Sequence, residues 1–278
     1  MHHVGRLTET TADVGAYSGH SNGYTRFPLI GRAAGSVHQE VTVAELAPGG
    51  SVDLAMHAFE EGLYVLQGSV LMSVPGVEEE LAADDFCFVE VGVPHFLSNP
   101  FSQPVRWLEV SAPQPGAALE DTVFPHGDAR GAEVDVPYRR GRFEESRLPA
   151  PSSALGLAGF GAANVGGASL KILMEREFGV SQFNLMVVQY VEGGLIKEHD
   201  HAFEEAFFFV SGEIEAVLDG KTYTLGAGDY CWSAVGSMHA FSNRSNVPVR
   251  WLETQVPQPP SRHQARFAGE WKRLAAAG

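Results

Sequence analysis

The chain has 278 residues, of which 44% are hydrophobic and 19% charged, a composition typical of folded proteins and unlike that of disordered ones. Its formal net charge of −15 argues against nucleic acid or an anionic membrane as a partner, because such binding depends on cations that neutralise phosphate. No apolar run reaches the roughly 20 residues of a membrane span, and residues 1–11 lack the apolar core of a secretory signal. With only two cysteines and no such signal, we expect a cytoplasmic protein.

Short runs rich in aromatic and β-branched residues predict strands along most of the chain. In chain order the clearest are 62–66, 69–74, 85–89, 206–210, 213–218, 222–225 and 230–233. Asp219-Gly220 separates two of them and predicts a two-residue hairpin turn. A helix is predicted over 261–277, where Ser261 is a candidate N-cap and Phe267, Trp271 and Leu274 share one face.

The sequence repeats itself at an offset of 144 residues. His57-Ala58-Phe59-Glu60-Glu61 recurs as His201-Ala202-Phe203-Glu204-Glu205, and Pro104–Glu109 recurs as Pro248–Glu253. Because no insertion breaks the register, the chain is a tandem duplication of one β domain. We predict a first domain over 1–118, a linker over 119–165 that includes a Pro/Ser/Gly/Ala-rich stretch, and a second domain over 166–278.

The second copy contains a cluster of residue types that bind transition metals. It reads His199-x-His201-x3-Glu205-x6-Gly212, followed by Gly228-x5-Ala234-x-Gly236-x2-His239-x3-Asn243. Alternate residues of a strand share a face, so His199, His201 and Glu205 are expected on one side of the sheet. Three imidazoles and a carboxylate suit a divalent first-row metal, with open positions for water or substrate.

These two blocks resemble the motif of the cupin superfamily, G-x5-H-x-H-x3,4-E-x6-G and G-x5-P-x-G-x2-H-x3-N, with Ala234 in place of the proline. The duplication makes the chain similar to a bicupin. The resemblance implies an all-β fold of two tandem jelly-roll barrels (double-stranded β-helices), to which the predicted C-terminal helix is added. It also implies that His199, His201, Glu205 and His239 are metal ligands.

The first copy departs from this motif at one position. Ala55 stands where the second copy has His199, while His57, Glu61 and His95 are retained. This set is either an incomplete second metal site resembling a facial triad, or a decayed site kept for structure.

Strand parity suggests what surrounds the intact site. Phe207, Phe209 and Phe241 follow the ligands on the same face, so they are expected either to line a substrate pocket or to fill the barrel core. The Arg-Trp-Leu-Glu motif occurs in both halves and favours a structural role, such as an Arg–Glu pair or an interface strand. No acid–base residue is identified beside the ligands and a metal-bound water.

Three classes of function stay open. The resemblance first implies an oxygen-dependent dioxygenase acting on a small aromatic or enol-type substrate chelated to the metal, with Glu205 as a base that dissociates transiently. The alternatives are a non-oxidative Mn-dependent hydrolase, lyase or decarboxylase, in a bicupin architecture similar to that of ureidoglycine aminohydrolase, and a non-catalytic small-molecule-binding cupin. Fe and Mn are the expected metals, with Ni, Co, Cu and Zn also compatible, and a homodimer is expected from the resemblance.

Overall fold

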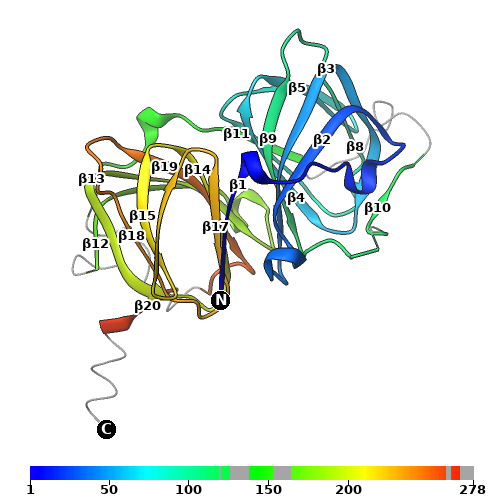
Figure 1. Cartoon of the computed structure of the whole chain (residues 1–278). Coiled ribbons are helices and arrows are strands. Elements are labelled where there is room, and N and C mark those ends of the chain that lie inside the picture. Colours follow the sequence, from blue (N-terminus) through cyan, green and yellow to red (C-terminus); the bar gives the residue numbers. More distant parts are fainter. Residues whose placement is uncertain (119, 126–137, 153–163, 261–263, 270–278) are drawn as a thin grey trace.

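The chain forms two β-barrels that lie side by side in the computed structural model (Figure 1). The structure describes residues 1–278 except 119, 126–137, 153–163, 261–263 and 270–278. Within these residues, no helix is both long and apolar enough to cross a membrane. The single-turn 3-10 helices are η1 (Leu7–Glu9), η2 (Gly15–Tyr17), η3 (Arg32–Ala34), η5 (Glu145–Arg147) and η6 (Arg176–Phe178).

The first barrel is a curled antiparallel sheet with the strand order β11-β7-β4-β9-β3-β8-β5-β6, and β2 and β10 also pair with β3. Its strands are β2 (Ser21–Ile30), β3 (Glu40–His57), β4 (Glu60–Gln67), β5 (Ser69–Val74), β6 (Val77–Ala82), β7 (Asp85–Val89), β8 (His95–Ser98), β9 (Val105–Ala112), β10 (Thr122–Val123) and β11 (Tyr138–Arg142).

The second barrel repeats this order as β1-β17-β14-β19-β13-β18-β15-β16, with β12 and β20 also pairing with β13. Its strands are β1 (His2–Arg6), β12 (Val165–Met174), β13 (Asn184–Asp200), β14 (Glu204–Ser211), β15 (Glu213–Leu218), β16 (Lys221–Gly226), β17 (Asp229–Ser233), β18 (His239–Ser242), β19 (Val249–Val256) and β20 (Arg266–Phe267). The all-β, tandem jelly-roll prediction is therefore confirmed.

Several turns depend on glycine or asparagine residues that are present in both halves, such as Gly212, Gly220 and Asn243. Asp219 and Gly220 both have positive φ, 46° and 77°, as a tight hairpin turn between β15 and β16 requires. Gly212 has φ of 74°, and a Cβ there would lie 2.5 Å from the carbonyl oxygen of Pro248, so only glycine fits between β14 and β15. Asn243 donates from Nδ2 to the carbonyl oxygens of Tyr190 and Val247, which ties the end of β18 to β13 and to the loop before β19.

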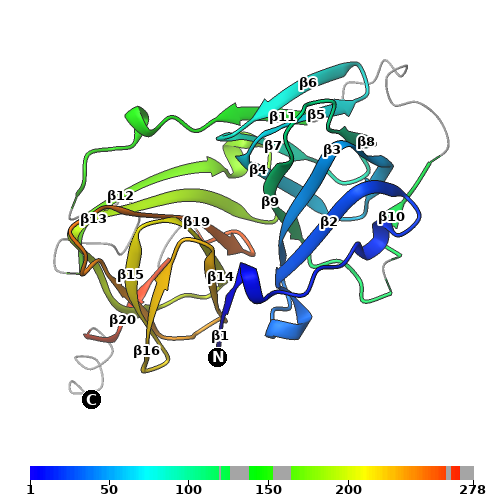
Figure 2. The same cartoon turned by 45° about the horizontal axis from the view of Figure 1, so that its top comes forward.

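The barrels exchange one strand each. β1, at the start of the chain, pairs with β17 of the second barrel, and β11 pairs with β7 of the first (Figures 1 and 2). Gly5 lies opposite Tyr230 and Gly141 opposite Phe86, and a Cβ on either glycine would come within 2.4 Å of the facing ring. The predicted boundaries near residues 118 and 166 stay a prediction, since the first sheet draws β10 and β11, and the second draws β1, from across them.

The buried apolar side chains form three clusters. One fills each barrel, and the third, which includes Phe88, Phe183 and Trp232, lies between the barrels and takes residues from both. Two buried carboxylates accept hydrogen bonds across this interface. Glu204 accepts hydrogen bonds from Ser36 Oγ and Val37 N of the first barrel, and Glu60 accepts them from Ser181 and Gln182 of the second.

The predicted C-terminal helix is wrong for residues 264–267, whereas Ala268 and Gly269 are helical. Phe267 lies in β20, opposite His199 of β13, and its ring stacks on the His199 imidazole at 5.2 Å. Pairing with an open segment of β13 satisfies backbone hydrogen bonds and buries Phe267, which outweighs the local helical pattern. Residues 261–263 of the predicted helix, with the candidate N-cap Ser261, and residues 270–277 fall outside the described residues.

Candidate metal centres

Neighbouring strands bring the four predicted ligands of the second barrel together. His199 and His239 are opposite each other on β13 and β18, directly after a break in register that follows Ile196. His201 lies just beyond β13, and Glu205 lies on β14. All four side chains are buried, and the three imidazoles have ring centroids 4.2–5.2 Å apart. The sequence spacing thus corresponds to one cluster inside the barrel.

Backbone carbonyls orient the three histidines of this cluster. His199 Nδ1 lies 2.7 Å from the carbonyl oxygen of Lys197, His239 Nδ1 lies 3.0 Å from that of Ser237, and His201 Nδ1 contacts that of Gln264. A carbonyl accepts only, so each Nδ1 carries the proton in the neutral ring. Each Nε2 is then left with a lone pair for the interior, as metal-bound histidines require.

The Glu205 carboxylate adds a negatively charged oxygen to the three imidazole nitrogens, so this set of donors favours a cation. Its Oε2 lies 3.3 Å from His201 Nε2 and 3.0 Å from His239 Nε2, yet this buried atom accepts no hydrogen bond of ordinary geometry. Metal–donor distances of about 2.0–2.2 Å place neighbouring donors about 3.0–3.4 Å apart. The residues present therefore fit a transition metal, with the soft-to-borderline nitrogen donors and one carboxylate that such ions prefer.

Burial and mutual charge set the protonation of the cluster. Burial, helped by the neighbouring histidines, holds the pKa of His199 well below its ordinary value, and burial also lowers the pKa of His201. Burial raises the pKa of Glu205, but His201 and His239 outweigh it and lower the pKa overall. Glu205 in turn raises the pKa of His239 against the effect of burial. Neutral imidazoles and an ionised carboxylate are the forms that bind metal.

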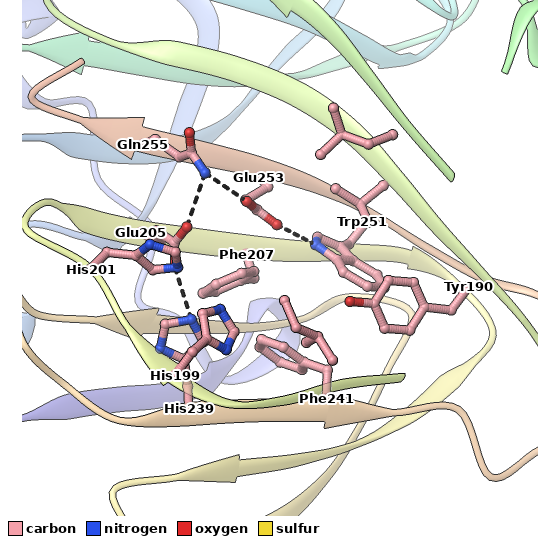
Figure 3. A pocket seen from close by; sticks show the side chains of 13 residues that line it. Tyr190, His199, His201, Glu205, Phe207, His239, Phe241, Trp251, Glu253 and Gln255 are labelled. Carbon is pink, nitrogen blue, oxygen red and sulfur yellow. Dashed lines mark hydrogen bonds and ion pairs between the residues drawn. The ribbon is translucent and has the colours of Figure 1, made fainter. Parts of the chain in front are cut away.

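A cavity opens beside this cluster, and its walls are mostly apolar (Figure 3). Phe207 and Phe241 line it, as predicted, and their ring centroids are 4.9 Å apart. Phe209 does not line it, because it lies deeper, packed against Phe241 and Trp251 in the barrel core. The other wall residues besides the four ligands are Leu170, Val188, Tyr190, Ile196, Trp251, Glu253 and Gln255.

The same cavity holds a carboxyl group that the sequence did not reveal. Glu253 accepts hydrogen bonds from Trp251 Nε1 at 3.0 Å and from Gln255 Nε2 at 3.2 Å, and the Gln255 amide also donates to Glu205 Oε1 at 3.0 Å (Figure 3). The arginine and the glutamate of the Arg-Trp-Leu-Glu motif do not pair with each other: Arg250 contacts Gln189 and Glu145, while Glu253 faces the interior. Alternation along β19, from Trp251 to Glu253 to Gln255, was the signal that could have found it.

Glu253 has no ion-pair partner among the described residues. Burial first, and the Glu205 charge second, raise the pKa of Glu253 to about 8. Its counterpart in the first barrel, Glu109, has a pKa raised by burial to about 7, with the nearby Arg26 acting to lower it. At the repeat offset, Leu170 stands in place of Arg26. The second barrel therefore keeps a carboxylic acid beside its metal ligands, in an apolar surrounding.

The first barrel assembles a smaller cluster from its three retained residues. Glu61 lies 3.6 Å from His57 Nε2 and 3.2 Å from His95 Nε2, and all three side chains are buried. Ala55 lies opposite His95, as His199 lies opposite His239, so one donor is absent at that position. A residue outside the repeated motif, Tyr17, places its hydroxyl 3.1 Å from His57 Nε2.

Comparison with known proteins agrees with this architecture. The chain is 34% identical over 111 residues to the tetracenomycin polyketide synthase protein TcmJ of Streptomyces glaucescens, a match that covers 38% of this chain and 74% of that protein. Among solved structures, the oxalate decarboxylase of Lactobacillus farciminis in complex with formate has a TM-score of 0.68 at 15% identity, covering 98% of this chain and 90% of that one. A variant of the Bacillus subtilis oxalate decarboxylase has a TM-score of 0.69 at 14% identity, covering 99% and 82%. At such low identity these structures show a shared fold.

The family model for the cupin domain matches the sequence twice, at residues 42–111 and 186–254. Each match spans one barrel and its cluster of buried histidines. The chain belongs to the cupin family and carries the domain in tandem.

Proposed function

We propose that the second barrel is a metal-dependent active site that cleaves or rearranges a small organic acid or enol by proton transfer, without consuming oxygen. One observation carries this proposal: a buried carboxyl with no cation partner among the described residues, Glu253, shares a cavity with four residues suited to hold a metal. A metal-dependent decarboxylase or lyase can use its ion as a Lewis acid and a nearby acid to protonate the carbanion or enolate that it generates.

His199, His201, Glu205 and His239 would hold a divalent ion. Once bound, such an ion would supply positive charge that polarises a substrate oxygen. Their backbone hydrogen bonds fix the imidazole rings beforehand, so little reorganisation is needed when the site is filled.

Glu253 would hold the proton that the reaction transfers. Burial raises the pKa of Glu253 to about 8 in the metal-free chain, which favours the protonated carboxyl, and the hydrogen bonds from Trp251 and Gln255 fix its orientation. Gln255 also links Glu253 to Glu205 by hydrogen bonds, so a change of charge at the metal would change the acidity of Glu253. The apolar walls exclude water and strengthen both interactions.

The relatives suggest the compounds to test first. The similar folds include oxalate decarboxylases, and the relative with the higher identity is a polyketide synthase protein. Oxalate, short α- and β-keto acids, and aromatic enols therefore form the panel.

A dioxygenase is the second candidate. The three-histidine, one-glutamate set, with Phe207 and Phe241 beside it, suits a flat substrate that chelates the metal through adjacent oxygens. This reaction would consume oxygen and would not need Glu253 as an acid.

The deciding experiment follows carbon dioxide release and oxygen uptake together on this panel, with Mn(II)-loaded or Fe(II)-loaded protein. We expect carbon dioxide release without oxygen uptake, and a kcat for Glu253→Gln lower by about 10²- to 10⁴-fold at unchanged metal content. The matched control is Glu109→Gln, the equivalent change in the first barrel, which should retain wild-type kcat. Oxygen uptake that survives in Glu253→Gln would select the dioxygenase, and no turnover of any compound by the metal-loaded protein would contradict both.

A further inference from the structure

Tyr17 occupies the metal-binding face of His57 in the first barrel. Its hydroxyl is 3.1 Å from His57 Nε2, the nitrogen that also faces Glu61. The other ring nitrogen, Nδ1, lies 3.1 Å from Thr122 Oγ1. The distances that join Tyr17, His57, Glu61 and His95 are 3.1, 3.6 and 3.2 Å, close to the separation of about 3.0–3.4 Å expected for donors around one ion.

The phenol is held in this position by packing. Tyr17 ends the short helix η2 and is 7% exposed, with its ring edge-on to Tyr24 at 5.1 Å and to Phe124 at 5.8 Å. Its backbone is fixed as well, because Ser21 Oγ donates to the Tyr17 carbonyl oxygen at 3.0 Å. A ligand fixed in this way loses little conformational entropy when an ion binds.

A second observation points to a cation at this cluster. Glu61 Oε2 is buried and accepts no hydrogen bond of ordinary geometry, as does its counterpart Glu205 in the other barrel. Arg26, the buried cation whose charge acts on this cluster, is paired with Glu40 and hydrogen-bonded to Thr42. The nearest group able to balance the charge of Glu61 is His95, whose pKa Glu61 raises, and an ion inside the barrel would take the place of that proton.

We propose that Tyr17 is a fourth ligand of a metal site formed with His57, Glu61 and His95, and that this site prefers a trivalent ion such as Fe(III). On binding, the phenol loses its proton to solvent, and its oxygen forms a bond to the ion without any change of oxidation state. The first barrel then offers two anionic oxygen donors, whereas the second offers one with three neutral imidazoles. Since the Coulomb energy grows with the product of the charges, the added anion favours the higher charge.

The duplication has therefore produced two unlike sites in one chain. The first is completed by a residue from outside the repeated motif, which explains how it tolerates alanine at position 55. This inference does not rest on the function proposed for the second barrel.

The test uses the full chain and ferric citrate as the probe. A ferric ion bound by phenolate absorbs visible light through charge transfer, a signal that imidazole and carboxylate ligands do not give. We expect this band in the wild-type protein, its loss in Tyr17→Phe, and its retention in Tyr24→Phe, which removes the hydroxyl of the neighbouring buried tyrosine. The band should also persist in the His199→Ala/His239→Ala variant, which lacks the second site.

Three results would overturn the proposal. These are the absence of the band in wild-type protein, its survival in Tyr17→Phe, and tighter Fe(III) binding by Tyr17→Phe. The last result would show that the hydroxyl only caps His57 in the metal-free chain. Because Tyr17→Phe keeps the ring, circular dichroism and the melting temperature verify that the variant is folded.

Discussion

The direction of each imidazole in the second barrel is set by a carbonyl group of the main chain. Lys197, Ser237 and Gln264 supply those carbonyls, so the side chains need no further partner to present Nε2 to the interior. A substitution among the ligands therefore removes a donor without disturbing the backbone that holds the others. Substitutions at these residues should therefore change metal affinity without changing the stability of the fold.

His201→Ala should weaken Mn(II) binding by the second barrel by about 100-fold or more, at least as much as the loss of a ligand's supporting partner costs. The fold should persist, because the barrel core does not depend on this ring. Equilibrium dialysis with elemental analysis measures the loss. His57→Ala is the matched control in the first barrel and should retain the second barrel's ion; an undiminished ion content in His201→Ala would refute the ligand assignment.

Glu253 makes the stability of the metal-free protein depend on pH. Its pKa is raised by burial to about 8 in the folded chain, against about 4.3 for an exposed glutamate. Between these values the unfolded chain ionises while the folded chain keeps the proton, so the stability contributed by this group is complete below about pH 4 and is lost as the pH rises through 8. The pKa of Glu205 is lowered in the folded chain, so the stability that this group contributes is lost as the pH falls, and only at acid pH.

The Glu253→Gln variant should accordingly lose less stability than the wild type between pH 5 and 8. Thermal denaturation in the presence of a chelator, at half-unit steps of pH, measures this difference. Glu109→Gln should show a smaller effect, because the pKa of Glu109 is raised by burial only to about 7. Parallel pH profiles for Glu253→Gln and wild type would contradict a protonated Glu253.

The residues of the second barrel's candidate metal centre could be identified from sequence, whereas two of their neighbours could not. His199, His201 and Glu205 share a strand parity, and His201, Glu205 and His239 recur at the 144-residue offset, which the sequence alone shows. Glu253 belongs to a motif present in both halves, and its setting depends on whether Arg26 or Leu170 stands on another strand. Tyr17 lies 40 residues from His57 and belongs to no repeat, so only the tertiary structure places it.

At the scale of elements, the exchanged strands β1 and β11 rely on glycines that face aromatic rings. Gly5 lies over Tyr230 and Gly141 over Phe86, which lets each ring cover the backbone of the incoming strand. Neither β1 nor β11 was among the strands predicted from composition. Their exchange was not predicted either, because nothing in β1 or β11 taken alone identifies which of two similar barrels receives it.

Gly5→Val and Gly141→Val should each destabilise the protein by about 1–3 kcal/mol, the usual cost of forcing extra atoms into a packed contact. Gly166→Val is the control: Gly166 is also in a strand, but a Cβ there has no neighbour within 4 Å. Urea denaturation measures the three midpoints. Equal midpoints for all three variants would show that the glycine–ring contacts do not hold the exchanged strands.

At the scale of the molecule, three features join the barrels into one unit. The exchanged strands cross between them, an apolar cluster is shared by both, and the Glu60 and Glu204 carboxylates each bind main-chain groups of the opposite barrel. A chain ending at residue 118 would lack β11 and would expose its side of the shared cluster. Neither barrel is therefore expected to fold alone, even though each has its own interior core.

The whole chain should unfold in one cooperative transition, with equal calorimetric and van't Hoff enthalpies. Mn(II) at 100 times its dissociation constant for the second barrel should stabilise both barrels by about 2.7 kcal/mol, since an ion bound only to the folded state is lost when either barrel opens. Amide hydrogen exchange tests this directly: slowly exchanging amides of β3 and β9 in the first barrel should gain protection when the ion binds to the second. The same experiment on the His57→Ala variant prevents ion binding in the first barrel. Any protection that the amides of that barrel then gain must come from coupling across the interface. Two separate transitions, of which Mn(II) moves only one, would show that the barrels are independent domains.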